Sequence, residues 1–131
     1  MFLMSLPVVL TIIFMHYIGD FILQAEKWAT NKSKSVSALI KHTLTYSLFM
    51  FLMSWVFFDF TVMNSLYFGV ITFTLHTLTD YYTSRVVSKM FQENKYGTPI
   101  PNRGAFSVIG FDQVLHYIQL FLTYYILSQI N

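Results

Sequence analysis

Three histidines in this chain are each paired with an aspartate four residues away, and such pairs can bind a metal ion. The pairs are His16 with Asp20, His76 with Asp80, and Asp112 with His116. Four residues make about one helical turn, so both members of a pair project from one face of one helix. Neutral imidazole and carboxylate are ordinary ligands of zinc, and they also suit manganese or iron. The spacing therefore predicts a divalent-metal site, with zinc as the first choice.

The fourth histidine, His42, stands alone and completes a ligand set that is large for one ion. The potential metal ligands are His16, Asp20, His42, His76, Asp80, Asp112 and His116. Because one ion rarely needs so many, we expect two ions, with one aspartate bridging them or orienting a ligand. Two-metal sites typically activate water for attack on a phosphoester. Asp20, Asp80 and Asp112 are therefore the candidate catalytic residues, one of which, or metal-bound hydroxide itself, would act as base.

Four polar residues near the pairs could assist such chemistry. Gln24 lies one turn beyond Asp20, and Gln113 follows Asp112, so either amide could orient a ligand or a water. Lys41 and Arg103 are candidates for holding an anion at the mouth of the site, such as phosphate or a lipid headgroup. Arg103 serves equally well as a determinant of membrane topology.

The elements that carry these residues are strongly apolar. The chain is 55% hydrophobic and only 11% charged, whereas soluble domains average about 25% charged residues. Four apolar segments approach the roughly 20 residues that a bilayer requires, at about 2–24, 36–58, 65–87 and 106–130. We predict an all-α polytopic membrane protein, a four-transmembrane-helix bundle in one domain over residues 1–131. The first segment is interpreted as a retained transmembrane helix, since no basic residue precedes it and no small-x-small cleavage site follows.

Two absences in the sequence exclude other classes of site and partner. The chain has no cysteine, which excludes disulfides, thiolate zinc sites and a cysteine nucleophile. It contains no basic run or aromatic platform, so no nucleic-acid partner is expected.

Ser35 is a plausible N-cap for the second segment.

All eight lysines and arginines lie on or beside the connections 25–35 and 91–105. The positive-inside rule therefore places both connections in the cytoplasm and both termini outside, in a multi-pass protein of the inner membrane. The first and third segments then run inward and reach histidine before aspartate. The fourth runs outward and reaches Asp112 before His116. This reversal brings all three pairs to one depth, near the cytoplasmic face.

Three functions could explain this layer of histidines and aspartates. The first is a metal-dependent hydrolase acting at the cytoplasmic face, on a lipid phosphoester. The second is a non-catalytic protein in which the cluster is a closed metal site or a polar contact between helices, since such residues often serve as interhelical hydrogen bonds. The third is transport of an ion or proton, which the sparse hydroxyls outward of the layer disfavour. The lipid bilayer is the expected partner, and the broad aromatic surfaces would support a homodimer.

Several short motifs carry a resemblance to a known family. They are HYIGDFILQ at 16–24, NK at 31–32, KH at 41–42, HTLTDYY at 76–82 and FDQVLH at 111–116. Together they resemble the domain-of-unknown-function family 3307, small polytopic bacterial and phage membrane proteins, over nearly the whole chain. The resemblance implies His16, Asp20, Gln24, His42, His76, Asp80, Asp112, Gln113 and His116 as site residues, but no activity. More distantly, the pattern is similar to membrane-bound metal-dependent hydrolases and to helical zinc phospholipases C, although nothing here matches the N-terminal tryptophan ligand of the latter.

Overall fold

The computed structural model describes residues 4–97 and 103–130, and within them it contains five α-helices and one short π-helix. The elements are α1 (Leu6–Tyr17), η1 (Ile18–Ile22), α2 (Glu26–Asn31), α3 (Val36–Phe57), α4 (Val62–Gln92) and α5 (Ala105–Gln129). The predicted all-α class is confirmed.

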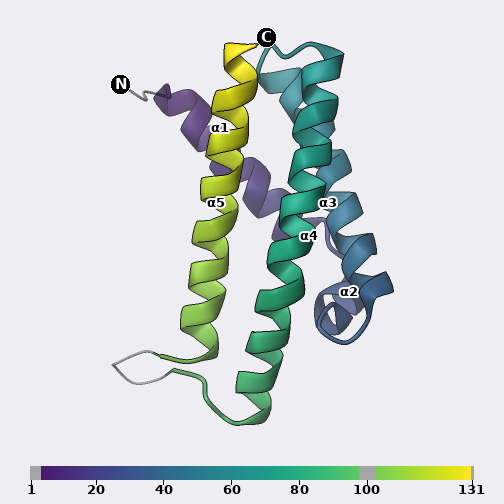
Figure 1. Ribbon diagram of the computed structural model, residues 1–131, viewed down its shortest axis with the longest axis vertical. Coiled ribbons are helices and arrows are strands. Elements are labelled where there is room, and N and C mark those ends of the chain that lie inside the picture. Colours follow the sequence, from purple (N-terminus) through teal and green to yellow (C-terminus); the bar gives the residue numbers. More distant parts are fainter. Residues whose placement is uncertain (1–3, 98–102, 131) are drawn as a thin grey trace.

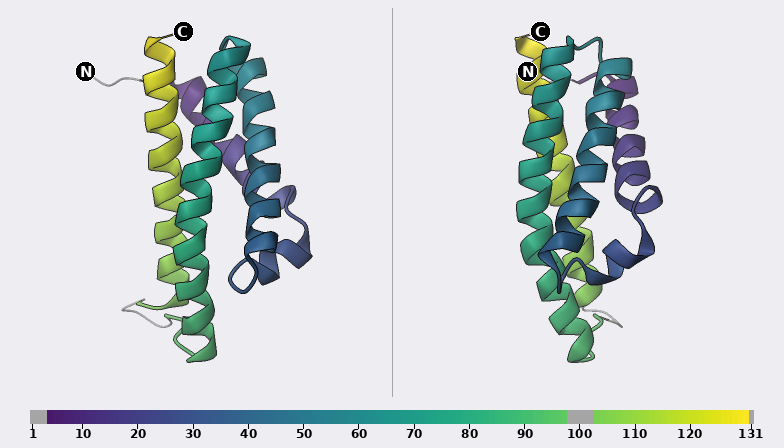
Figure 2. Two further views of the ribbon diagram at one scale, coloured as in Figure 1. Left: turned by 45° about the vertical axis from the view of Figure 1, so that its right-hand side comes forward. Right: turned by 90° about the vertical axis from the view of Figure 1, so that its right-hand side faces the viewer.

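The long helices α3, α4 and α5 run side by side along the molecule, and α1 crosses them obliquely (Figures 1 and 2). Helix α4 packs against both α3 and α5, while α1 and η1 contact α3. Helix α1 begins and α5 ends at the same end of the molecule, opposite the end where α2 and the α4–α5 connection lie (Figure 1).

The helix ends follow local capping chemistry. The Ser35 hydroxyl accepts a hydrogen bond from the Ala38 backbone N–H at 3.3 Å, so the predicted N-cap of α3 is confirmed. The Thr61 hydroxyl accepts from the Asn64 backbone N–H at 3.1 Å and starts α4 in the same way. Asn94, with φ of 56°, ends α4 in the left-handed conformation that asparagine tolerates.

The element bounds differ from the predicted segments in three places. The first segment is not one continuous α-helix, because its last turn is the π-helix η1. The third extends in both directions, and its 31 residues span about 46 Å at 1.5 Å per residue. The connection 25–35 contains the short helix α2. The length of an apolar run is enough to locate a segment. It does not reveal the capped start or the amphipathic end of α4, nor a six-residue helix with no apolar stripe such as α2.

Two helices in the described part of the chain, α3 and α5, are long and apolar enough to cross a membrane. The continuous run of α1 and η1, Leu6–Ile22, is apolar but shorter. Helix α4 carries His76, Asp80, Arg85 and Lys89 along its length, and these polar residues lower its mean hydropathy. The composition of the helices therefore supports two spans, α3 and α5.

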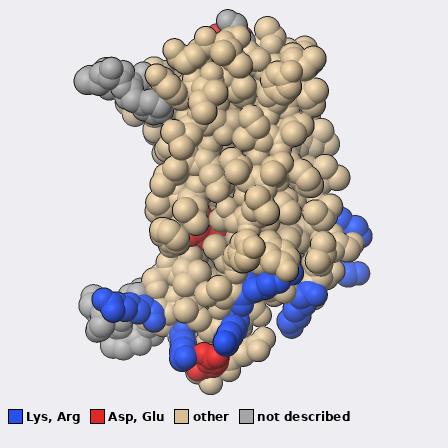
Figure 3. Space-filling view, in the orientation of Figure 1, with Lys and Arg blue, Asp and Glu red and all other residues tan. Residues whose placement is uncertain are grey.

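The molecule buries many of its polar residues and exposes many of its large apolar ones. The buried residues include all four histidines and the aspartates of the three pairs, whereas large aliphatic and aromatic side chains are exposed along every long helix. One apolar cluster, which includes Ile12, Met50, Phe68 and Leu120, lies on the side of the histidines away from α2, where Ser47, Ser54, Ser65, Thr72 and Thr123 are also buried. Lysine and arginine side chains gather at the α2 end of the face drawn in Figure 3.

Candidate metal centre

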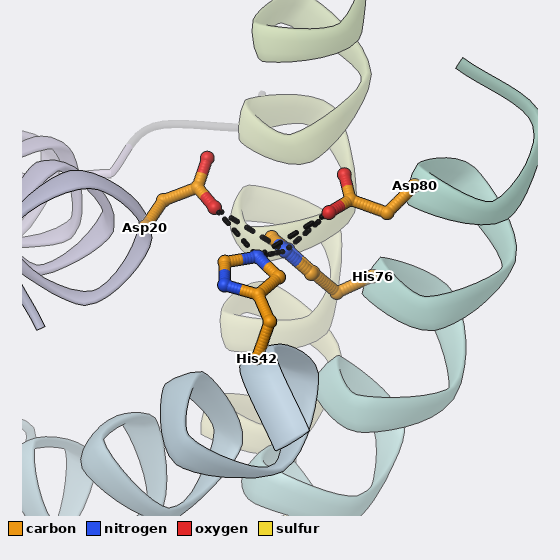
Figure 4. Close-up of side chains that lie close together, drawn as sticks. All are labelled: Asp20, His42, His76 and Asp80. Atoms are coloured by element: carbon orange, nitrogen blue, oxygen red, sulfur yellow. Dashed lines mark hydrogen bonds and ion pairs between the residues drawn. The ribbon is translucent and has the colours of Figure 1, made fainter. Parts of the chain in front are cut away.

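Four side chains from three elements meet at one point in the buried interior (Figure 4). Asp20 comes from η1, His42 from α3, and His76 and Asp80 from α4. The His42 Nε2 atom lies 3.1 Å from His76 Nε2, 3.1 Å from Asp20 Oδ1 and 3.3 Å from Asp80 Oδ2. The His76 Nε2 atom lies 3.4 Å from Asp20 Oδ1 and 3.5 Å from Asp80 Oδ2. We call these four atoms the central group.

Five of the six separations within the central group are close to those between ligand atoms around a small tetrahedral cation. Zinc binds histidine nitrogen and carboxylate oxygen at about 2.0–2.2 Å, so tetrahedral ligand atoms lie about 3.3–3.6 Å apart. The five separations above run from 3.1 to 3.5 Å. Two nitrogens and two oxygens at such distances form a ligand set that zinc accepts.

Hydrogen bonding within the protein cannot account for all these contacts. An imidazole nitrogen carries at most one proton, yet His42 Nε2 faces two carboxylate oxygens and a second imidazole nitrogen. The Nδ1 atoms of His42 and His76 are buried and have no hydrogen-bond partner among the described residues, and a cation at the Nε2 atoms would leave them so. A single cation at the centre would satisfy all four converging lone pairs at once.

A second, looser group adjoins the first and shares Asp80 with it. Asp80, Asp112 and His116 bring ligand atoms within 4.8 Å of one another. Asp80 uses its other oxygen here, because Oδ1 lies 3.7 Å from His116 Nε2 while Oδ2 belongs to the central group. Asp112 is held by Thr83, whose hydroxyl donates to Oδ1 at 2.6 Å. Asp80 is thus placed to bridge two ions.

His16 is also buried in this cluster, but both its ring nitrogens have protein partners. The Gln113 amide nitrogen donates to Asp112 at 3.1 Å and to Asp20 at 3.4 Å, so its oxygen accepts from His16 Nε2 at 2.8 Å. His16 Nδ1 then accepts from the Tyr46 hydroxyl at 2.7 Å. With Asp20 and His116, His16 forms a third possible ligand group. In this arrangement its bonds link Tyr46 to Gln113.

The π-helix η1 positions Asp20. An α-helix with one wider turn rotates the residues in that turn relative to a regular helix, and such turns are frequent at functional sites. Gly19 lets η1 approach α3 closely, since a Cβ atom there would lie 2.8 Å from the ring of Tyr46 and 3.2 Å from Phe49. Asp20 thereby reaches across to His42 and His76 as well as toward His16 on its own helix.

A cavity of about 690 Å³ borders the cluster on the side of α2. Its wall includes all three aspartates of the pairs, and also Gln24 and Gln113. Apolar side chains complete the wall, among them Phe21, Val87, Phe91 and Ile109. The volume lies within the range of small-molecule sites.

Lys32 reaches this cavity from the α2–α3 connection. Its Nζ atom donates to Asp80 Oδ2 at 2.7 Å, and the lysine side chain is 21% exposed. Burial alone would lower the pKa of Lys32, but the carboxylates of Asp80 and Asp20 outweigh burial and raise that pKa. The ammonium therefore stays charged beside the central group.

The structure brings together all seven predicted ligands, which lie in the three overlapping groups. Gln24 and Gln113 also line the cavity, and the Gln24 side-chain oxygen is buried there without a hydrogen-bond partner among the described residues. Lys41 and Arg103 are exposed and are not part of the cavity wall. Whether the ligands bind metal and the aspartates act in catalysis stays a prediction.

Three residues at the site were missed by the sequence reasoning: Lys32, Tyr46 and Thr83. Tyr46 follows His42 by four residues, and Thr83 follows Asp80 by three, so helical spacing could have found both. Lys32 belongs to the NK motif at 31–32, but only the fold shows that α2 turns it toward Asp80.

Comparison with known proteins identifies a family without an activity. No curated protein and no solved structure matches the chain significantly. One family model, described as Protein of unknown function (DUF3307), matches residues 8–131. Since this match covers nearly the whole chain, including every residue of the cluster, the protein belongs to the DUF3307 family.

Proposed function

We propose that this protein is a membrane-embedded, metal-dependent hydrolase that acts on a lipid phosphoester at the cytoplasmic face of the inner membrane. The observation that carries the proposal is the central group, with separations that suit tetrahedral zinc, beside a second ligand group and a cavity. Manganese or iron would also accept these ligands.

The surface of the helices supports the membrane part of the proposal. Only 22% of the apolar window of α5 is buried, and 39% of that of α3, whereas a core helix of a soluble protein is mostly buried. The exposed apolar residues on α1 and α4, such as Leu10, Phe14, Val70 and Leu78, continue this belt. Four spans with both termini outside would place the basic end in the cytoplasm.

Charge balance supports a divalent ion. Asp20, Asp80 and Asp112 are all buried, and Lys32 is in direct contact with Asp80. If all four are ionised and the histidines are neutral, two negative charges remain, and buried charges need compensation. One divalent ion supplies it. A second ion at Asp112 and His116 would make the site positive and would attract an anionic substrate.

The two groups suit different roles in hydrolysis. The central group offers four protein ligands, which saturate a tetrahedral ion, whereas the second offers three, which is the usual number at a catalytic zinc. Asp80 and Asp112 of the second group face the cavity. Asp80, Asp112 and His116 would hold an ion there, which would supply an activated water for attack on phosphorus. The Asp112 carboxylate would take a proton from that water and return it to the ester oxygen, which would leave as an alcohol.

A lipid phosphoester suits the cavity because one part of the cavity wall is polar and another part is apolar. The aspartates, glutamines and Lys32 line its polar part, while Phe21, Val87, Phe91 and Ile109 offer apolar contact. An amphiphile could therefore place its phosphate at the cluster and its hydrocarbon among the apolar side chains.

The closest rival is a closed structural metal site, which the four ligands of the central group would equally satisfy. The second group and the cavity favour the enzyme, since a structural zinc needs neither. Transport is disfavoured by the apolar cluster around Met50 and Phe68, which occupies part of the interior on the other side of the histidines.

Metal content tests the proposal first. Detergent-purified wild type should carry one or two equivalents of zinc, manganese or iron by mass spectrometry. His42→Ala and the nearly isosteric Asp80→Asn should lose most of it. Thr74→Ala is the matched control, because Thr74 is exposed on α4 and its hydroxyl only bonds Val70 of the same helix. A wild type without stoichiometric metal contradicts the proposal.

Activity is then tested on the metal-loaded protein. Phosphatidic acid and other phospholipids in mixed micelles are the substrates, and released phosphate or headgroup is the readout. We expect turnover that a chelator abolishes and added zinc restores, and that Asp112→Asn loses. Stoichiometric metal with no turnover of any phosphoester would favour the structural site.

A further inference from the structure

We infer that Lys32 is the anion-binding residue of this site: it neutralises Asp80 when no metal is bound and turns to the phosphate of the substrate when metal is present. The inference rests on the proposed function, whose substrate class it narrows to esters with a negatively charged phosphate. It starts from the contact between Lys32 Nζ and Asp80 Oδ2, 2.7 Å long.

The oxygen that Lys32 contacts is one that a metal would need. Asp80 Oδ2 is a member of the central group, 3.3 Å from His42 Nε2 and 3.5 Å from His76 Nε2. An ion bound there would draw electron density from this oxygen and repel the nearby ammonium. Metal and Lys32 therefore compete for Asp80, and binding of the metal leaves Lys32 without its strongest partner.

The space open to a displaced Lys32 is the cavity that its side chain already lines. Two other polar groups of that wall are buried without hydrogen-bond partners among the described residues, the Ser84 hydroxyl and the Gln24 side-chain oxygen. The Ser84 hydroxyl can donate, and Gln24 can offer phosphate its amide N–H₂ group, whereas its oxygen is an acceptor that phosphate does not satisfy. Lysine, serine and amide donors from three segments therefore line one cavity, and phosphate oxygens accept hydrogen bonds from such donors.

The segment that carries Lys32 is ordered by its own hydrogen bonds. The Lys32 backbone N–H donates to the Trp28 carbonyl at 2.9 Å, and the Asn31 carbonyl accepts from Lys34 and Ser35, both at 2.9 Å. These bonds end α2 and start α3, so the base of the Lys32 side chain is fixed. Only the side chain needs to move between Asp80 and the cavity.

The other basic candidates do not share this placement. Lys34 lines the cavity but is exposed, and Lys41 and Arg103 lie outside its wall. Lys34 therefore provides the matched control, because it has the same charge, lies on the same connection and borders the same cavity.

The experiment measures zinc affinity and phosphate affinity on detergent-purified full-length protein. Zinc affinity comes from competition with a chromophoric chelator, and binding of inorganic phosphate to the zinc-loaded protein comes from calorimetry. Lys32→Met should bind zinc at least threefold more tightly and phosphate at least tenfold more weakly than wild type. Lys34→Met should change both by less than twofold, and Lys32→Arg should keep phosphate binding within about threefold.

Each failure has a separate meaning. If wild type binds none of zinc, manganese and iron, the proposed function and this inference both fail. If wild type binds zinc but Lys32→Met keeps the phosphate affinity of wild type, or if Lys34→Met loses as much, only the inference about Lys32 fails. Weaker zinc binding by Lys32→Met would also overturn it, since Lys32 would then support the metal site instead of competing with the metal.

Discussion

Hydrogen bonds at the level of single residues decide which atoms of the cluster are available to a metal. Gln113 bonds three members, His16, Asp20 and Asp112, and so ties α5 to the chain around η1. Tyr46 holds His16 from the other side and stacks on the ring of His76, with ring centroids 4.1 Å apart. Partners of metal ligands often matter nearly as much as the ligands themselves.

Replacing Gln113 with alanine should weaken metal binding without removing a ligand. The change frees Asp20, Asp112 and His16 to rotate, and loss of such partners typically lowers metal affinity by about 10–100-fold. Chelator competition measures the effect. Gln119→Ala is the control, because Gln119 lies on the same helix but donates to Thr79 at 2.7 Å, outside the cluster. Equal zinc affinities for the two variants would contradict the role given to Gln113.

Tyr46→Phe should destabilise the protein even though the aromatic ring remains. The change removes the hydroxyl that His16 Nδ1 contacts at 2.7 Å and leaves this buried nitrogen without a partner. An unsatisfied buried acceptor costs about 1–3 kcal/mol. Thermal unfolding in detergent should give a lower midpoint for Tyr46→Phe than for Tyr67→Phe, a control on an exposed residue of α4. Matching midpoints would show that the bond adds no stability.

At the scale of elements, close approach between helices is what brings the ligands together. Gly69 allows α4 to pack tightly on α3, since a Cβ atom there would lie 2.9 Å from Phe51 Cβ and 3.2 Å from the Ser47 carbonyl oxygen. Gly19 does the same for η1 and α3. Small residues at such contacts are the usual means of close helix packing in membranes.

Gly19→Ala should therefore move η1 away from α3 and withdraw Asp20 from the central group. The ring of Tyr46 cannot easily yield, because it is buried, stacked on His76 and bonded to His16. Overpacking of this kind costs about 1–3 kcal/mol, and metal content should fall together with the unfolding midpoint. Gly110→Ala is the control, since nothing lies within 4 Å of the added Cβ atom. Wild-type metal content in Gly19→Ala would contradict this account of η1.

At the scale of the whole molecule, charge is separated along one axis. Lysine and arginine side chains gather at one end of the molecule (Figure 3). Lys27 lies in α2 and Lys32 and Lys34 follow it, while Arg85 and Lys89 lie in the last turns of α4 and Lys95 follows that helix. The cavity opens on the cluster from this basic end, where the positive-inside rule expects cytoplasm. Substrate would then enter from the cytoplasmic leaflet, whose lipids include anionic ones.

Cysteine labelling tests this topology without background, because the chain has no cysteine. Ser37→Cys lies near the basic end, and Gln129→Cys lies at the last turn of α5, both at exposed positions. In intact spheroplasts a membrane-impermeant maleimide should label Gln129→Cys but not Ser37→Cys. Permeabilised membranes should label both and provide the control. The reverse pattern in intact spheroplasts would contradict the predicted orientation.

The sequence by itself determined which histidines and aspartates form the cluster, the approximate positions of the long helices and the gathering of basic residues at one end. Each of these depends on local pattern: the four-residue spacing of His76 and Asp80 gives one helix face, and an apolar run shows roughly where a long helix lies. The reversed order of Asp112 and His116 also predicts that the three pairs meet, because the direction of each helix follows from the positions of the basic connections. The residues of the pairs do lie in overlapping groups.

Only the tertiary structure decided which atoms meet. The rotation of each helix about its axis determines that Asp80 shares its two oxygens between groups and that His16 bonds Tyr46 and Gln113. The π-turn at Asp20 and the return of α2 that brings Lys32 to Asp80 depend on contacts between residues far apart in the chain. Such contacts leave no periodic trace in the sequence, because they follow from how helices pack on one another and not from how each one forms.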